Sequence, residues 1–326
     1  MRTYIITILA LMLSSLSLAT QKPKLYVKAY GDPSKQPVIF VHGGPGHSSL
    51  DFEVTTAEKL AQRGFYVVVF DQAGQGRSDE IDPSQYSYQR YADDIKSIID
   101  EMKLHDPILI GHSHGGPVSI AFDLAYPGVA KKIVLASAPI DFWAAMQSIF
   151  ESCASKYSKS GDEEKLSQIS FIKMKLTYDF ESLTDEERVS FVGSSFFHAL
   201  NFCKLYSPSQ PTVESIELRK LVAQNSQPIA SSGATTAMPG FLKNEDYIHK
   251  NQIEHVYAER SRYCGIYGDE DGLFSPLSLG VIKLTLNGQD GVNRFALLKG
   301  ASHAVYIDQQ DAFFEALRSN CELQWR

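Results

Sequence analysis

Five residues, Gly111-His112-Ser113-His114-Gly115, carry more structural information than any other part of this chain. A short apolar run at residues 107–110 precedes them, and residues 116–122 have the composition of a buried helix. A strand, a G-x-S-x-G turn and a helix, in that order, are the context of a nucleophile elbow, where a sharp turn exposes the serine hydroxyl. Glycines flank the serine because the backbone of such a strained turn passes close to its neighbours. The pattern therefore predicts Ser113 as a nucleophile.

Outward from the elbow, strand-like and helical segments alternate along the chain. Most of the strand-like runs are apolar throughout, as expected where both faces of a sheet are covered. Strands that alternate with helices predict βαβ units, and hence a doubly wound, mostly parallel sheet of the α/β class. The predicted strands lie at residues 24–31, 37–41, 65–70, 107–110, 132–136, 263–267 and 294–298, and the predicted helices at residues 51–62, 88–103, 116–122 and 310–319.

This alternation stops near Ile140 and returns only at the strand-like run of residues 263–267. The segment between, residues 141–259, is richer in Ser, Lys, Tyr and Phe. It contains a helical stretch at residues 171–178, and loop signals at residues 207–211 and 231–240. A chain of 326 residues can bury one large core with such an insertion. We therefore expect a core of residues 20–140 and 260–326, and a cap inserted at residues 141–259.

The first nineteen residues have the pattern of a signal peptide. Arg2 supplies a positive charge, residues 4–13 are largely apolar, and Ser17-Leu18-Ala19 places small residues at a cleavage site. The apolar run is short for a membrane span, although a retained anchor is the alternative. We expect cleavage after Ala19 and a secreted or periplasmic protein without stable membrane insertion.

Overall composition excludes several classes of protein. With 44% hydrophobic and 21% charged residues, the chain is neither disordered nor fibrous. A net charge of −7 argues against nucleic acid as a partner. A small molecule or short peptide is the expected ligand, and the composition does not indicate an oligomeric state.

The four cysteines can pair in three complete ways after export. Cys153 and Cys203 lie in the same inserted region, which favours that pair, and four buried free thiols are the alternative. No spacing among the cysteines resembles a zinc site.

A serine nucleophile needs a general base, and the base needs an acid that orients it. In doubly wound sheets such groups gather beyond the carboxyl ends of the strands. His303, in Gly300-Ala301-Ser302-His303, follows the strand predicted at residues 294–298 and is the expected base. Asp271 follows the preceding strand and is the expected acid, with Asp269 as the alternative.

An oxyanion hole requires two backbone N–H groups directed at the developing negative charge. The residue after the nucleophile, His114, supplies one of them, and a loop after an early strand supplies the other. That loop is His42-Gly43-Gly44-Pro45-Gly46, in which Gly44 is the expected donor; a merely tight turn is the alternative. His112 and His114 lack a third ligand and predict no metal site. We expect His114 to line the acyl pocket and His112 to pack behind the elbow.

Together with the run Phe70-Asp71-Gln72-Ala73-Gly74-Gln75-Gly76-Arg77-Ser78, these motifs resemble the α/β-hydrolase superfamily and, within it, the proline iminopeptidase-like branch (peptidase family S33). The resemblance covers residues 24–140 and 262–326 and implies an α/β-hydrolase fold with an inserted, largely helical cap. Two positions depart from the branch, which usually has arginine at position 73 and tryptophan at position 114. In such aminopeptidases acidic cap residues hold the free amine of the substrate. Glu151, Glu181 and Glu186 are candidates, but nothing singles one out, and a surface glutamate on an amphipathic helix is the favoured interpretation of each.

The sequence thus predicts an exported serine hydrolase with an acyl-enzyme mechanism and no metal or organic cofactor. The resemblance favours a proline iminopeptidase-like aminopeptidase acting on small peptides. A carboxylesterase or lipase-like hydrolase of small acyl esters is the main alternative, and perhydrolase chemistry is a lesser one. A hydrolase-fold binding protein without turnover is a further alternative from a different class.

Overall fold

A seven-stranded, mostly parallel sheet forms the centre of the computed structural model, which describes residues 22–178, 182–184, 186, 187, 190, 203, 205–226, 236–243 and 251–325. The strand order is β1-β3-β2-β4-β5-β6-β7. Only β1 runs antiparallel to its neighbour β3; every other pair is parallel. All seven predicted strands are present, as β1 (Val27–Tyr30), β2 (Gln36–Val41), β3 (Phe65–Phe70), β4 (Ile108–His112), β5 (Lys132–Ala136), β6 (Tyr263–Gly268) and β7 (Phe295–Leu298).

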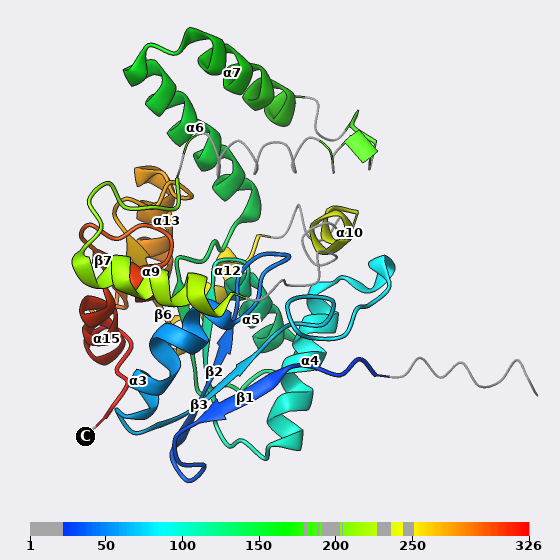
Figure 1. Ribbon diagram of the computed structural model, residues 1–326, viewed down its shortest axis with the longest axis vertical. Coiled ribbons are helices and arrows are strands. Elements are labelled where there is room, and N and C mark those ends of the chain that lie inside the picture. Colours follow the sequence, from blue (N-terminus) through cyan, green and yellow to red (C-terminus); the bar gives the residue numbers. More distant parts are fainter. Residues whose placement is uncertain are drawn as a thin grey trace, which may run out of the picture.

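Helices cover both faces of the sheet, as Figure 1 shows. The described helical elements are α2 (Leu50–Phe52), η1 (Glu53–Ala57), α3 (Glu58–Ala61), η2 (Pro83–Gln85), α4 (Tyr88–Glu101), α5 (Gly115–Ala125), α6 (Phe142–Ser160), α7 (Glu163–Tyr178), α9 (Val213–Asn225), α10 (Met238–Leu242), α12 (Ile253–Ala258), η5 (Arg260–Arg262), α13 (Pro276–Asn287), α14 (Val305–Asp308) and α15 (Gln310–Ser319). The helix predicted at residues 51–62 is present as α2, η1 and α3, which follow one another without a break.

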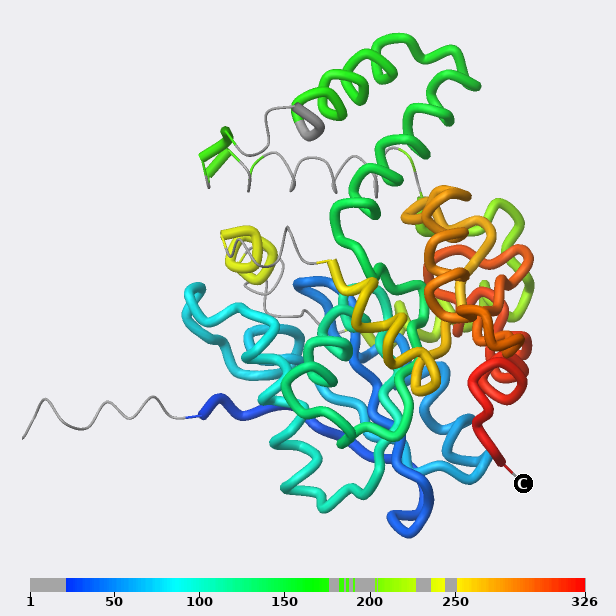
Figure 2. Tube along the Cα trace, turned by 180° about the vertical axis from the view of Figure 1, so that it is seen from behind, coloured from blue at the N-terminus to red at the C-terminus, as the bar shows by residue number. Residues whose placement is uncertain are grey.

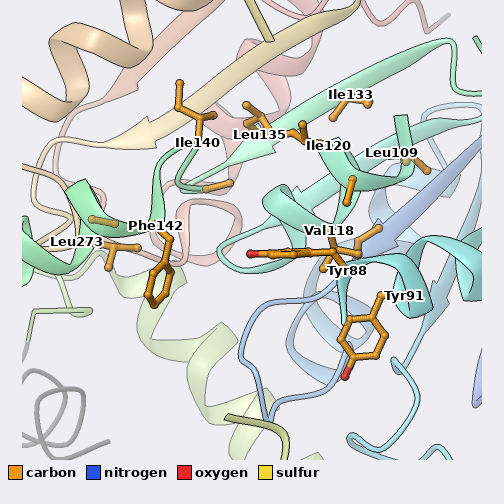
Figure 3. Packing of buried hydrophobic residues seen from close by; sticks show 14 of the residues in the cluster. Tyr88, Tyr91, Leu109, Val118, Ile120, Ile133, Leu135, Ile140, Phe142 and Leu273 are labelled. Atoms are coloured by element: carbon orange, nitrogen blue, oxygen red, sulfur yellow. The ribbon is translucent and has the colours of Figure 1, made fainter. Parts of the chain in front are cut away.

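The alternation of side chains along the strands divides the core into two apolar layers. On one face, Leu109 and Ile133 of the sheet pack with residues of α4 and α5, such as Tyr91 and Val118 (Figure 3). On the other face, side chains of the same strands, such as Ile110, pack with residues of α3, α14 and α15. Burial on both faces explains why these strands read as continuous apolar runs.

The chain between β5 and β6 leaves the sheet and returns to the adjacent position, because β5 and β6 pair directly. Two of its helices, α6 and α7, project away from the sheet in both Figure 1 and Figure 2. In contrast, α9 packs against α14 and η1, and its Leu218 belongs to the core layer on that face. The segment expected to form a cap therefore contributes one helix to the side of the core.

One loop expectation in this segment is wrong in part. Residues 207–211 form neither helix nor strand, as predicted, but Met238–Leu242 forms α10 where a loop was expected. Pro239 lies in the first turn of α10, where a missing N–H breaks no helical hydrogen bond. Residues 231–235 of the same prediction lie outside the described residues.

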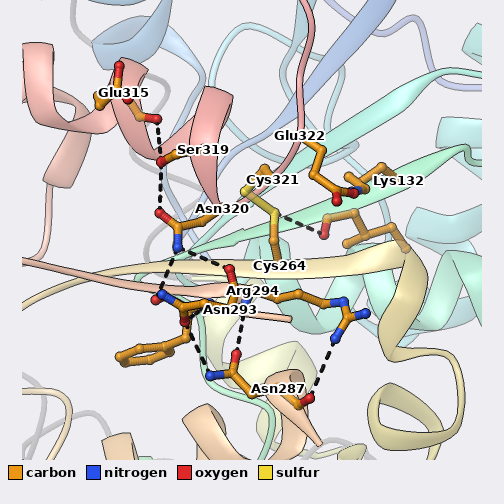
Figure 4. Close-up of a disulfide and its surroundings, with 12 residues drawn as sticks. Lys132, Cys264, Asn287, Asn293, Arg294, Glu315, Ser319, Asn320, Cys321 and Glu322 are labelled. Carbon is orange, nitrogen blue, oxygen red and sulfur yellow. Dashed lines mark hydrogen bonds and ion pairs between the residues drawn. A yellow bond between two sulfur atoms is a disulfide. The ribbon is translucent and has the colours of Figure 1, made fainter. Parts of the chain in front are cut away.

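Two disulfides join distant parts of the chain. Cys153 of α6 pairs with Cys203, which confirms the favoured pair. Cys264 of β6 pairs with Cys321, just after α15 (Figure 4). The alternative of four free thiols is therefore wrong.

Among the helices that the structure describes, none combines the length and the apolarity that crossing a bilayer requires. The expected signal peptide, residues 1–19, lies outside the described residues.

Candidate active site

Ser113 occupies a strained turn between β4 and α5. Its φ of 52° lies in the left-handed region, which residues other than glycine rarely adopt. The turn is held by the tertiary structure, since the backbone N–H of Ser113 donates to the carbonyl of Ala136 at 3.0 Å. The structure thus has the backbone geometry that a nucleophile elbow requires.

The glycines around Ser113 lie so close to neighbouring atoms that a side chain would not fit. A Cβ atom at Gly115 would lie 2.0 Å from the carbonyl oxygen of Val41, and one at Gly111 would lie 2.5 Å from the carbonyl oxygen of Gly115. At Gly116 the added atom would lie 2.3 Å from the Cβ of Ala138. A larger residue at any of these positions would displace the turn.

His303 and Asp271 are brought together from the loops after β7 and β6. The Nδ1 atom of His303 lies 2.9 Å from the Oδ2 atom of Asp271, whose side chain is fully buried. The backbone N–H of Leu273 donates to the other carboxylate oxygen of Asp271. The alternative acid, Asp269, instead accepts a hydrogen bond from the backbone N–H of Gly300 at 2.7 Å. Of the two candidate acids, only Asp271 contacts the imidazole.

Ser113 and His303 line the same cavity, which has a volume of about 340 Å³. His114 and Gly44, the two expected oxyanion donors, also line it. Thus three segments that are far apart in the sequence meet around one cavity at the carboxyl ends of the strands. Much of the remaining wall is apolar and comes from both core and cap, with Phe40, Pro117, Phe142, Ala145, Met146, Met238 and Leu273 among the lining residues.

The glycine-rich loop after β2 lies directly against the elbow. A Cβ atom at Gly43 would lie 2.8 Å from the Cβ of Ser113, and Gly44 has a φ of 126° that disfavours any other residue. His42 fastens the loop: its Nδ1 atom donates to the carbonyl of Gly43 at 2.7 Å, and its Nε2 atom accepts from the N–H of Gln72 at 2.9 Å. Burial lowers the pKa of His42 to about 4, so the ring is neutral and can both donate and accept.

The two histidines beside Ser113 occupy different surroundings. His114 is buried and lines the cavity, and burial lowers its pKa to about 3. His112 lies next to the base, because its Nε2 atom donates to the carbonyl of His303 at 3.0 Å. No cluster of metal-ligating side chains occurs among the residues that the structure describes.

Several residues that line the cavity were not identified from the sequence. The ring of Tyr206 lies 4.5 Å from that of His303, and the ring of Tyr306 lies 5.1 Å from that of His112. Asp51 and Arg219 also line the cavity. Of these four residues, only Asp51 lies close in sequence to the glycine-rich loop, and it could have been proposed from that proximity.

The two described acidic residues that were considered as amine ligands, Glu151 and Glu186, lie away from this cavity. Glu151 forms an ion pair with Lys173 at 3.2 Å and lines a second cavity between α6 and α13. Glu186 is exposed, and Glu181 lies outside the described residues. Neither Glu151 nor Glu186 lines the cavity that contains Ser113.

Asp71, in the motif of residues 71–78, binds the chain that follows the glycine-rich loop. Both carboxylate oxygens of Asp71 accept from the guanidinium of Arg77, at 2.7 and 3.0 Å. Asp71 also accepts from the N–H and the hydroxyl of Ser49, at the start of α2. Although burial opposes it, this set of donors keeps the pKa of Asp71 below its usual value. The ion pair thereby fixes the path of the chain between the loop and α2.

This sheet order, with an elbow after β4 and an acid and a histidine after β6 and β7, is that of the α/β-hydrolase fold. A family model described as the alpha/beta hydrolase fold matches residues 36–170. The chain thus has the α/β-hydrolase fold, and the resemblance found in the sequence is confirmed.

Particular relatives include both peptidases and esterases. The proline iminopeptidase of Saccharolobus solfataricus is 23% identical over 90% of this chain and 87% of its own length. The bifunctional esterase/perhydrolase DCH of Acinetobacter calcoaceticus is 32% identical, over 35% of this chain and 41% of its own length. The crystal structure of a proline iminopeptidase-related protein from Thermus thermophilus superposes with a TM-score of 0.62 at 21% identity, covering 93% of this chain and 96% of that protein.

Proposed function

We propose that this protein is an exported serine hydrolase that cleaves a small amide or ester through an acyl-enzyme. The observation that carries the proposal is the 2.9 Å contact between His303 and Asp271 at the edge of the cavity that Ser113 lines. In this mechanism, His303 takes the proton of the Ser113 hydroxyl while the oxygen attacks the substrate carbonyl. Asp271 holds the imidazolium that forms, and His303 then protonates the leaving group.

The backbone N–H groups of Gly44 and His114 are proposed to stabilise the oxyanion. Both residues line the cavity that contains Ser113, and each such donor contributes about 3 kcal/mol to lowering the barrier. Water then attacks the acyl-enzyme with His303 as the base, and the acid is released.

A proline iminopeptidase-like aminopeptidase is the activity that we favour. A cavity of about 340 Å³ suits a small substrate and not a folded protein. A proline iminopeptidase matches 90% of this chain, and the structure of a proline iminopeptidase-related protein covers 93% of it.

An esterase is a second candidate, which the apolar lining favours. Phe142 and Met146 of α6, together with Leu273, offer a surface for an acyl chain. The esterase/perhydrolase relative supports the same candidate.

Export is supported by the two disulfides, because disulfides persist in oxidising compartments and are rare in the cytosol. Detecting the mature N-terminus at residue 20 in protein recovered from outside the cytoplasm would test the proposed cleavage.

Labelling with a fluorophosphonate probe tests the proposed nucleophile. The native protein should react and the Ser113→Ala variant should not. A parallel assay with a prolyl arylamide and a short-chain aryl ester separates the two candidate activities, since turnover of the ester alone would exclude the peptidase. If the native protein neither labels nor turns over either substrate, a binding protein of hydrolase fold becomes the better explanation.

A further inference from the structure

One acidic side chain on the wall of the proposed active site has no role in the mechanism above. Asp51 lies in the first turn of α2 and lines the same cavity as Ser113 and His303. Among the described residues its side chain forms no hydrogen bond or ion pair, and only its backbone carbonyl accepts a hydrogen bond, from the hydroxyl of Thr55. A carboxylate on a largely apolar wall is costly unless a cation or hydrogen-bond donors compensate for the lost water.

The neighbouring carboxylates all have partners. Glu53, two residues further on, accepts from Tyr26, Lys28, Tyr30 and Arg77. Asp308 accepts from Arg219 and from Ser302. Asp51 is thus the carboxylate of this region that the described residues leave uncompensated.

Asp51 has no direct ion-pair partner among the described residues at the cavity. Arg219 also lines the cavity, but its guanidinium is paired with Asp308. The pKa of the Asp51 carboxyl is raised by burial, although the nearby charges of His47 and Arg219 oppose this shift. The guanidinium of Arg219 thus already has a carboxylate partner, and a cation on the ligand would give Asp51 a direct partner of its own.

Tyr306 lies near both Asp51 and the proposed catalytic residues. Burial raises the pKa of the Tyr306 hydroxyl, and the nearby charge of Asp51 raises it further. The ring of Tyr306 packs against Phe52, the residue after Asp51, with ring centroids 5.3 Å apart. The same ring lies 5.1 Å from the ring of His112, which in turn lies 4.9 Å from that of His303. Asp51, Tyr306, His112 and His303 all line the same cavity.

We propose that Asp51 binds the protonated amino group of the substrate, and so makes this enzyme select ligands with a free amine beside the scissile carbonyl. This inference rests on the proposed hydrolase function and deepens it. It assigns the amine to a residue of the core that follows the glycine-rich loop, whereas Glu151 and Glu186 of the expected cap do not line the cavity.

A structural role for Asp51 must be separated from this binding role. An acidic residue in the first turn of a helix interacts favourably with the helix dipole, so its loss could simply destabilise α2. Such an effect would weaken the binding of all substrates alike. Binding of an amine would instead change only the discrimination between a free and a blocked amine.

The test compares a prolyl arylamide with its N-acetyl derivative, using the full-length mature protein. For Asp51→Asn, the ratio of kcat/KM for the free amine to that for the blocked amine should fall about 10- to 100-fold, the size expected for one charge-assisted hydrogen bond. Asp51→Glu should retain part of the preference. Asp311→Asn, which changes an exposed carboxylate on α15, should leave the ratio unchanged.

If the protein turns over only esters, inhibition experiments test whether Asp51 binds a free amine. Prolinamide should inhibit hydrolysis of a neutral aryl ester more strongly than N-acetylprolinamide, and Asp51→Asn should remove the difference. An unchanged ratio, or an equal loss with both ligands, would overturn the role of Asp51 while leaving the hydrolase intact. Failure of the native protein to label with a fluorophosphonate would instead overturn the proposed function itself.

Discussion

Asp269 and Asp271 stand two positions apart in the loop after β6, yet they do different things. Asp271 contacts the imidazole of His303, whereas Asp269 accepts from the backbone of the next loop at Gly300. At the residue scale, therefore, chemically identical side chains are distinguished only by which way the turn directs them.

Replacing Asp271 and Asp269 separately by asparagine tests which of them is the acid that orients His303. Asp271→Asn should lower kcat by about 10³- to 10⁴-fold, because the amide no longer favours the correct tautomer or stabilises the imidazolium. Asp269→Asn should lower kcat by less than about 10-fold, since it weakens one backbone hydrogen bond. Steady-state kinetics on whichever substrate the protein accepts would measure both. Equal losses in the two variants would contradict the assignment of the acid.

At the element scale, the elbow depends on how closely α5 approaches the strands. The start of α5 passes so near β2 that Gly115 has no room for a side chain. Gly280, within α13, has no neighbouring atom within 4 Å of an added Cβ. Replacing Gly115 by alanine therefore tests close packing, and replacing Gly280 by alanine tests helix propensity alone.

Gly115→Ala should destabilise the protein by several kcal/mol and abolish labelling of Ser113, because the new methyl group would collide with the carbonyl of Val41. Gly280→Ala should stabilise it by about 0.5–1 kcal/mol through helix propensity. Urea unfolding monitored by circular dichroism gives both values. If the Gly115→Ala variant kept native stability and labelling, close packing of α5 against β2 would not be required for the elbow.

Helices α13 and α10 were not predicted from the sequence. The sequence analysis did not anticipate α13, although Ser275 caps its first turn and Pro276 opens it, a combination that typically begins a helix. In α10, Pro239 and Gly240 were interpreted as loop signals, but packing stabilises a short helix there. A Cβ atom at Gly240 would lie 2.4 Å from the ring of Tyr86, which shows how close this packing is. Local signals fail where such contacts outweigh them.

At the scale of the whole molecule, the two disulfides stabilise different parts. The bond between Cys264 and Cys321 ties β6 to the C-terminal segment of the core, and that between Cys153 and Cys203 closes a loop within the inserted region. Each closes a loop of 50 or more residues, so each restricts the unfolded chain considerably.

Removing the core disulfide, by changing Cys264 and Cys321 to alanine, should lower the free energy of unfolding by about 2–5 kcal/mol. Removing the other pair should shorten the lifetime of the inserted region under limited proteolysis and leave the unfolding of the sheet less affected. Denaturant unfolding together with mapping of cleavage sites would distinguish the two. Identical unfolding and cleavage profiles for the two variants would mean that the inserted region and the core unfold as one unit.

The sequence alone determined the α/β class, the strands, and the candidate positions of Ser113 and His303, because apolar periodicity and glycine-flanked turns depend on neighbouring residues. The sequence favoured Asp271 as the acid and Cys153–Cys203 as a pair, but only the tertiary structure showed the contact of Asp271 with His303, the second disulfide, and Asp51 at the same cavity as Ser113. Those features depend on where separate segments meet in space. Such meetings are set by the packing of the whole sheet and its helices, which no local pattern contains.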